Sequence, residues 1–143
     1  MDGAADARRL VVVALGTEEY GLPAALVREV VGYSAPRPVP GSPMHVEGVI
    51  NLRGRIIPVV DLRRRFGAGG ARPDGAQIVV VAMPGLTVGV VVDETREVLT
   101  LPAGACRPQP GGHDAVEGVA TLRGRSVVVL DIFRLLAERP LAA

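Results

Sequence analysis

The chain has 143 residues, of which 48% are hydrophobic and only 3% aromatic, and its formal net charge at pH 7 is +1. This length is typical of one ordinary domain, or of two very small ones that share a core. A nearly neutral chain lacks the positive excess expected of a protein that grips a nucleic-acid backbone. All 16 basic residues are arginine, which excludes chemistry that needs lysine, such as a Walker A loop or a Schiff base.

The first third of the chain predicts short β-strands separated by turns. Apolar, largely β-branched residues fill 10–15. A polar turn follows at 16–19, and residues 20–22 form a second apolar stretch. Residues 23–26 begin with proline, which suits the first turn of a helix. Residues 27–33 are expected to continue as a strand.

A Gly/Pro-rich passage at 35–43 predicts a loop, and a hairpin is expected after it. Two apolar runs, 46–52 and 55–60, flank the dipeptide Arg53-Gly54, a pattern typical of a β-hairpin. Asp61 stands where the second run ends and a helical pattern begins. Aspartate accepts hydrogen bonds from the free N–H groups of a first helical turn, so this residue is predicted to be an N-cap.

The chain is an internal duplication. Residues 46–66 and 116–136 are identical at 11 of 21 positions at an offset of 70, and Asp131 repeats the predicted cap. With a two-residue adjustment the similarity extends upstream, so we expect subdomains at about 10–67 and 78–137, with a Gly-rich linker between them. Two copies are too few for a solenoid, which needs at least ~3 repeats, and favour a pair of small β-barrels or a sandwich.

Side chains typical of enzyme sites are scarce. The two histidines, His45 and His113, lie in Gly/Pro-rich loops, and no cysteine or histidine spacing suits a metal site. The arginine run 63–65 lacks the aromatic residues on which bases stack, so it is interpreted as a solvated helix face. We therefore predict a binding module, not an enzyme, with no cofactor and no metal.

Cysteine content and hydropathy bear on the compartment. Cys106 is the single cysteine, so no intrachain disulfide can form and a reducing environment is expected. The N-terminal sequence is polar and lacks the apolar stretch of a signal peptide. No apolar run approaches the ~20 residues of a membrane-spanning helix. We expect a cytoplasmic protein.

The stretch GVINLRGRIIPVVDLRRRFG at 48–67 closely resembles the signature of CheW-like domains. Supporting stretches at 18–33, 88–102 and 131–136 follow in the family's order, so the resemblance covers roughly 10–137. It implies an all-β fold of two intertwined, SH3-like, five-stranded β-barrels with short helices. It also implies a non-catalytic adaptor that couples chemoreceptors, the methyl-accepting chemotaxis proteins, to a CheA-type histidine kinase, and that is recruited beneath membrane receptor arrays.

The resemblance also assigns candidate partner-binding residues. Arg53 matches the arginine of the family's NLRG motif, which is associated with receptor coupling, and Gly48 and Asn51 belong to the same block. Val27 and Glu29 match a segment linked to receptor and kinase contacts. The implied partners are the cytoplasmic tips of chemoreceptors and the kinase's regulatory domain, with no nucleic acid and no direct membrane insertion.

Two roles are open for Arg53 on physical grounds. A planar, permanently charged side chain on a turn can reach the carbonyls or carboxylates of a partner. Alternatively, it pairs internally with Glu47 or Glu29 and holds the hairpin. The second copy keeps the arginine as Arg123 but has Thr121 in place of the asparagine, so the copies are expected to have separate roles if a partner needs the whole motif.

Gly48 and its counterpart Gly118 occur in both copies. Glycine at such a position indicates a close backbone approach or a positive φ angle. Beyond the adaptor, two functions stay open. One is a CheW-like scaffold of a non-flagellar motility or developmental pathway that binds receptors but not the kinase. The other is a small nucleic-acid-binding barrel, which the neutral charge and missing aromatics disfavour.

Overall fold

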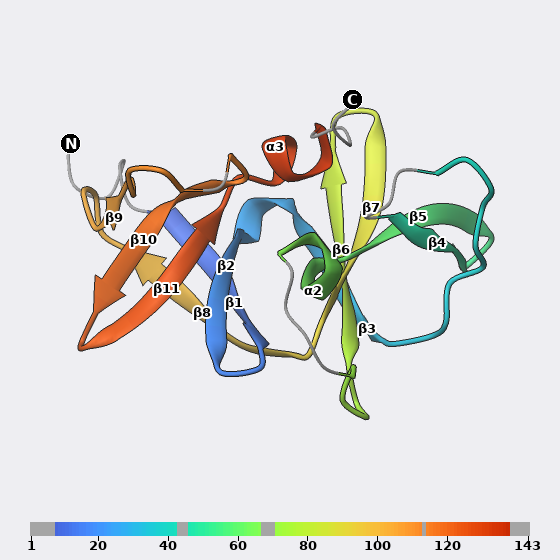
Figure 1. Ribbon diagram of the computed structural model, residues 1–143, viewed down its shortest axis with the longest axis horizontal. Helices are drawn as coiled ribbons and strands as arrows, with labels where there is room; N and C mark the ends of the chain where they lie inside the picture. The colour runs from blue at the N-terminus through green and yellow to red at the C-terminus, as the bar shows by residue number, and fades with distance from the viewer. Residues whose placement is uncertain (1–7, 43–45, 67–70, 113, 138–143) are drawn as a thin grey trace. The chain divides into compact units, whose positions relative to one another are not determined.

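The computed structural model describes residues 8–42, 46–66, 71–112 and 114–137, and these form two compact units (Figure 1). Unit 1 takes the described residues up to 25 and from 95 onward, and unit 2 takes those from 26 to 94. Both histidines and residues 67–70, at the start of the predicted linker, lie outside the described residues.

Unit 2 is a five-stranded sheet with the order β3-β6-β7-β5-β4. Strands β4 and β5 form the predicted hairpin, and the short helix α2 follows it directly. The elements are β3 (Val27–Gly32), β4 (Val46–Leu52), β5 (Arg55–Asp61), α2 (Leu62–Arg65), β6 (Gln77–Met83) and β7 (Leu86–Val92).

Unit 1 is a six-stranded sheet with the order β8-β1-β2-β11-β10-β9. The one-turn helix predicted after the second strand is the 3-10 helix η1 (Ala24–Leu26). The elements are β1 (Arg8–Leu15), β2 (Glu18–Pro23), β8 (Glu94–Leu101), β9 (Cys106–Arg107), β10 (Val116–Leu122), β11 (Arg125–Leu130) and α3 (Ile132–Ala137).

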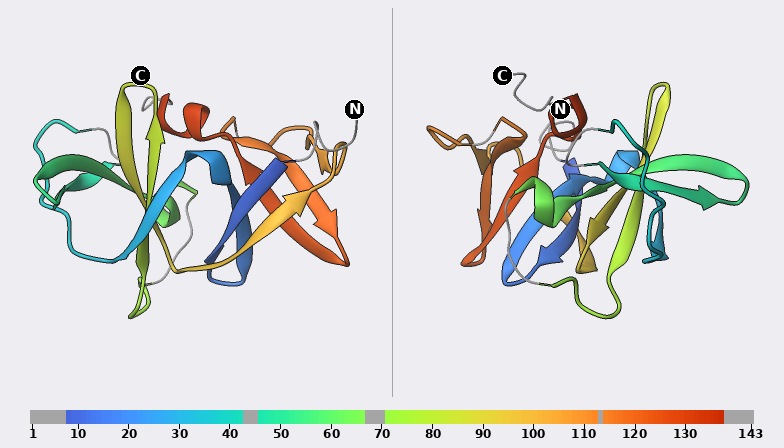
Figure 2. Two further views of the ribbon diagram at one scale, coloured as in Figure 1. Left: turned by 180° about the vertical axis from the view of Figure 1, so that it is seen from behind. Right: turned by 45° about the vertical axis from the view of Figure 1, so that its right-hand side comes forward.

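Each unit takes strands from both sequence copies. In Figure 1 the blue strands β1 and β2 belong to the same sheet as the orange strands β10 and β11. The joins are parallel pairs, β2 with β11 in unit 1 and β5 with β7 in unit 2, and Figure 2 shows them from two further sides. The prediction of an all-β fold with two intertwined SH3-like barrels is confirmed. The sequence copies at 10–67 and 78–137 and the compact units are two different divisions of the chain.

The two sheets repeat each other strand for strand. Their shared order differs only by β9, two residues long, which pairs Arg107 with Val119. Unit 2 has an isolated bridge at the same place, between Arg37 and Val49. Arg107 lies 70 residues after Arg37, and Val119 lies 70 residues after Val49, so the two pairs are equivalent. Strand β9 is therefore a longer form of a contact that both copies make.

Valine, leucine and isoleucine build the two cores, as the lack of aromatics predicts. Val59 and Val60 are adjacent on β5, and both are fully buried. Because neighbouring side chains on a strand point to opposite faces, both faces of β5 are covered here, as the unbroken apolar run predicts. The main core clusters are Ile50, Ile57, Val59, Ile78, Val80 and Val91 in unit 2, and Leu10, Leu101, Ala120 and Val129 in unit 1.

Both predicted helix caps are confirmed. The backbone N–H of Arg63 donates to Oδ1 of Asp61 at 2.9 Å, and that of Arg134 donates to Oδ1 of Asp131 at 3.1 Å. Asp61 is buried, so this contact satisfies a carboxylate that would otherwise be costly to desolvate. The Arg63 side chain also pairs with Asp93 at 2.6 Å, which ties α2 to the end of β7.

We predict that Asp61→Ala lowers the free energy of unfolding by about 1 kcal/mol, because the first turn of α2 loses its acceptor. Asp61→Asn keeps an acceptor oxygen and is expected to lose less. Urea denaturation of the three proteins measures the difference. Equal stability of Asp61→Ala and the unchanged protein would show that the cap contributes nothing.

Candidate functional site

The β4–β5 turn sets the position of Arg53. Arg53 and Gly54 have φ angles of 50° and 86°, so both central residues are left-handed, as in the type I′ turn favoured by two-residue hairpins. The side-chain Oδ1 of Asn51 accepts a hydrogen bond from the N–H of Gly54 at 2.8 Å. Asn51 therefore shapes the turn from within. Left-handed backbone is uncommon for arginine, so the turn holds this side chain against its local preference.

Arg53 makes an internal ion pair and remains accessible. Its guanidinium donates two hydrogen bonds to the carboxylate of Glu29 on β3, each 2.6 Å long. The hydrogen bond from Arg53 lowers the pKa of Glu29, and the same contact raises the pKa of Arg53. The arginine side chain is nevertheless 70% exposed. Because exposed ion pairs contribute little to stability, the pair serves mainly to fix the direction of the guanidinium.

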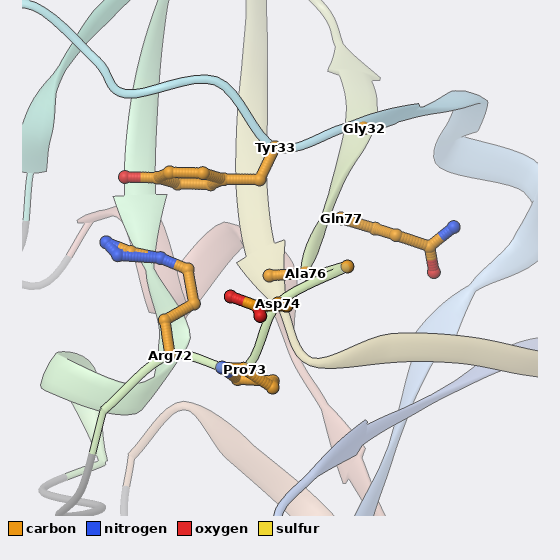
Figure 3. Close-up of a pocket in the computed structure, with 8 residues that line it drawn as sticks. Gly32, Tyr33, Arg72, Pro73, Asp74, Ala76 and Gln77 are labelled. Carbon is orange, nitrogen blue, oxygen red and sulfur yellow. The ribbon is translucent and has the colours of Figure 1, made fainter.

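The sequence left open whether Arg53 pairs with Glu47 or with Glu29, and the structure shows Glu29. Glu47 has other partners, Tyr33 and Arg72, whose side chains line the pocket drawn in Figure 3. It accepts hydrogen bonds from the Tyr33 hydroxyl at 2.9 Å and from Arg72 at 3.2 Å. The guanidinium of Arg72 lies 3.9 Å from the centre of the Tyr33 ring, a cation–π contact that Figure 3 shows nearly edge-on, with the guanidinium below the ring.

The five candidate residues fall into two places. Arg53, Asn51 and Glu29 come together at the turn, and Val27 lies two residues before Glu29 on β3, half-buried and paired with β6. Gly48 lies at the opposite end of β4, where it pairs with β5. The structure therefore separates Gly48 from the cluster around Arg53.

Gly48 has a steric role of its own. A Cβ atom there would lie 2.3 Å from the carbonyl oxygen of Arg37, and one at Gly118 would lie 2.5 Å from that of Arg107. The predicted close backbone approach is thus confirmed at both positions. In each unit the glycine lets a neighbouring segment bond to the hairpin strand.

We predict that Gly48→Ala lowers the free energy of unfolding by about 1–3 kcal/mol, because the new methyl group meets backbone that cannot move freely. Gly32→Ala is the matched control, since a Cβ there meets no atom within 4 Å. It is expected to change stability by less than about 0.5 kcal/mol. Thermal melts of both variants test this. Similar melting points for the two would contradict the close approach at Gly48.

The Arg53–Glu29 pair forms one rim of a groove of about 290 Å³ in unit 2. Arginines line the groove together with apolar side chains of β4, β5 and β6. Arg55, at the start of β5, donates a hydrogen bond to the Thr87 hydroxyl on β7 at 3.3 Å. The lining residues are Arg28, Glu29, Leu52, Arg53, Arg55, Ile57, Val80, Ala82 and Thr87.

The sequence patterns did not single out Arg28, Arg55 and Thr87 as parts of this site. The available signal was the alignment of the two copies. Arg55 corresponds to Arg125, and Arg28 corresponds to Arg96.

The corresponding place in unit 1 holds a closed ion network. Glu19 accepts hydrogen bonds from Nε of Arg125 at 2.7 Å and from Arg96 at 2.8 Å. Arg125 also pairs with Glu97. These contacts, chiefly the hydrogen bond from Arg125, lower the pKa of Glu19. Glu19 takes the position on β2 that Thr87 takes on β7, since both face an alanine on the partner strand.

Because the folded state lowers the pKa of Glu19, its stabilising effect is present above the ordinary value of 4.5 and disappears as pH falls through the lowered one. We predict that Glu19→Gln costs about 1 kcal/mol of stability at pH 7. The difference from the unchanged protein is expected to shrink as the pH is lowered from about 5 to about 3. Urea titrations at several pH values measure it.

Glu18→Gln is the control for this prediction. Glu18 is the exposed neighbour of Glu19 and forms no ion pair among the described residues. A pH-independent loss for Glu19→Gln, or an equal loss for Glu18→Gln, would contradict the network's role.

The described residues also bear on metal binding, membrane crossing and thiol chemistry. Within them, no group of three or more histidine, cysteine, aspartate or glutamate side chains is arranged to hold a metal ion. In that same part of the chain, none of the helices has the length and apolar character needed to cross a bilayer. The Cys106 thiol is half-buried, and burial raises its pKa, which makes it less reactive.

Twin SH3-like barrels with an arginine-rimmed, partly apolar groove define a protein-binding module built by duplication. The family described as the CheW-like domain matches residues 9–139, and the chain belongs to this family. The chain is 34% identical to the chemotaxis protein CheW of Klebsiella aerogenes over 141 residues, with 94% of this chain and 85% of that protein covered. It is 31% identical to the chemotaxis protein CheW of Rhizobium meliloti, with 87% and 84% covered.

A solved structure agrees with the fold. The crystal structure of the scaffolding protein TtCheW from Thermoanaerobacter tengcongensis superimposes with a TM-score of 0.83 at 33% sequence identity. The match covers 92% of this chain and 88% of that one. Similarity therefore extends over nearly the whole chain.

Proposed function

We propose that this protein is a CheW-type adaptor that couples chemoreceptors to a CheA-type histidine kinase in chemotaxis signal transduction. Membership of the CheW-like family and the similarity to chemotaxis proteins named CheW support this function. The observation that carries it in this chain is the placement of Arg53. The turn and Glu29 hold its guanidinium in one direction, yet the side chain is 70% exposed to a partner.

The adaptor acts by differential contact and makes or breaks no covalent bond. A receptor tip docks on the cluster of Arg53, Glu29 and Val27, and the kinase's regulatory domain docks on another part of the barrels. A change in receptor conformation alters the docking free energies and so shifts the kinase between its states. The protein works in the cytoplasm beneath the receptor arrays, without binding nucleic acid and without entering the membrane.

The rival function is a scaffold in a non-flagellar motility or developmental pathway that binds receptors but not the kinase. The protein FrzA of Myxococcus xanthus is also a relative, 33% identical over 102 residues, with 71% of this chain covered. The CheW proteins of Klebsiella aerogenes and Rhizobium meliloti match a larger share of the chain, which favours the chemotaxis role. Stimulation of a CheA-type kinase in reconstituted receptor arrays separates the two functions, because the rival predicts none.

We predict that Arg53→Glu weakens binding to a soluble chemoreceptor-tip fragment by about tenfold or more, because it reverses the charge at the centre of the contact. Arg123→Glu is the matched control, since Arg123 has the same left-handed geometry in the corresponding turn of unit 1, with a φ of 53°. It is expected to bind normally. A pull-down with circular dichroism of each variant tests this. Unchanged binding by Arg53→Glu would contradict the proposed receptor contact.

A further inference from the structure

The duplication gives this molecule an internal comparison for the groove beside Arg53. Both copies supply three arginines at corresponding positions. Unit 2 has Arg28, Arg53 and Arg55, and unit 1 has Arg96, Arg123 and Arg125. A glutamate follows the first arginine in each copy, as Glu29 and Glu97. The charged groups are thus alike except for one acidic residue.

That residue is Glu19 of unit 1, whose place in unit 2 is taken by Thr87. The Glu19 carboxylate lies between two arginines, with hydrogen bonds of 2.7 Å from Arg125 and 2.8 Å from Arg96. Its side chain is only 13% exposed. Unit 1 therefore shows that this framework of strands can bind a carboxylate between two guanidinium groups.

Unit 2 keeps the arginines and lacks the second carboxylate. Arg53 is paired with Glu29, whereas the one partner of Arg55 within the described part of the chain is the hydroxyl of Thr87, at 3.3 Å. Among the described residues, Arg28 forms no ion pair, and it lines the same groove. Three arginines against one glutamate leave the groove with a net charge of +2, where the counterpart in unit 1, with two glutamates, has +1.

The floor of the groove is apolar. Leu52 and Ile57 come from the hairpin, and Val80 and Ala82 come from β6. An occupant that suits both parts has a short hydrocarbon stem and a terminal anion, as the side chains of glutamate and aspartate do. Planar arginines bind such carboxylates with two parallel hydrogen bonds.

We propose that this groove, beside Thr87, receives an acidic side chain from the chemoreceptor tip, which takes the place that Glu19 fills in unit 1. The identity of the partner rests on the proposed function, whereas the carboxylate chemistry rests on the comparison of the two units. Arg55 and Arg28 are the binding residues, and Thr87, which is uncharged, leaves both guanidinium groups without a carboxylate among the described residues.

The test places in unit 2 the carboxylate that unit 1 has at the equivalent position. Thr87→Glu places a carboxylate where unit 1 has Glu19, and Thr87→Gln places a side chain of nearly the same size without the charge. Binding of each full-length variant to a soluble chemoreceptor-tip fragment is measured by titration, and thermal melts check that each variant folds. We expect Thr87→Glu to bind at least tenfold more weakly and Thr87→Gln to stay within about threefold of the unchanged protein. Equal binding by all three proteins, or an equal loss in both variants, would overturn the inference.

A second arm needs no receptor. Sodium acetate is titrated into the protein at constant ionic strength, with sodium chloride as the reference, and the Nε–H signals of the arginines are followed by NMR. We expect a saturable shift for Arg55 that is absent in Thr87→Glu and retained in Thr87→Gln. If the unchanged protein fails to bind the receptor fragment, the proposed function fails, and the acetate titration alone decides the carboxylate site. No shift in the unchanged protein, or the same shift in Thr87→Glu, would overturn the site.

Discussion

Parallel strand pairing between the two sequence copies is the interaction on which this structure depends. Val59 of the first copy pairs with Gly89 of the second, and Val129 pairs with Gly21 in the same way. A Cβ at Gly89 would lie 2.7 Å from Cγ2 of the buried Ile78, so glycine lets the neighbouring core side chain fill this space. Without these pairs the sheet of unit 2 would be cut into the β4–β5 hairpin and a three-stranded remainder, and the sheet of unit 1 into two three-stranded pieces.

The candidate site depends on the same joins. Arg53 and Arg55 come from the first copy, where Arg53 lies in the β4–β5 turn and Arg55 begins β5. Thr87 comes from the second copy, on β7. Strand β5 pairs with β7, so the arginines and the threonine line one groove although they lie more than 30 residues apart in sequence. The groove is therefore a product of strand exchange, and neither copy alone contains it.

Local patterns predicted the local structure well. The Arg53-Gly54 turn, the caps Asp61 and Asp131 and the short helical turn after β2 depend on residues close in sequence, and all were found. Which hairpin joins which sheet depends on pairing between distant strands, which periodicity does not encode. The exchange was expected only through the family resemblance.

The candidate site was predicted in part for the same reason. The pairing of Arg53 with Glu29 was one of two alternatives, because charge alone did not distinguish Glu29 from Glu47. Arg55 and Thr87 were missed, since their contact crosses from one copy to the other.

The exchange also suggests how such a molecule began. Strand β2 in unit 1 and strand β3 in unit 2 are separated only by the three residues of η1 (Ala24–Leu26). This short connection leaves little chain for the β1–β2 hairpin to fold back onto the rest of its own copy. Short hinges of this kind favour mutual swapping of an element between identical protomers. An ancestral polypeptide with a single copy would then have formed the same pair of barrels as a homodimer. Fusion of two such copies would let them diverge, and the two units do differ at the equivalent positions Glu19 and Thr87.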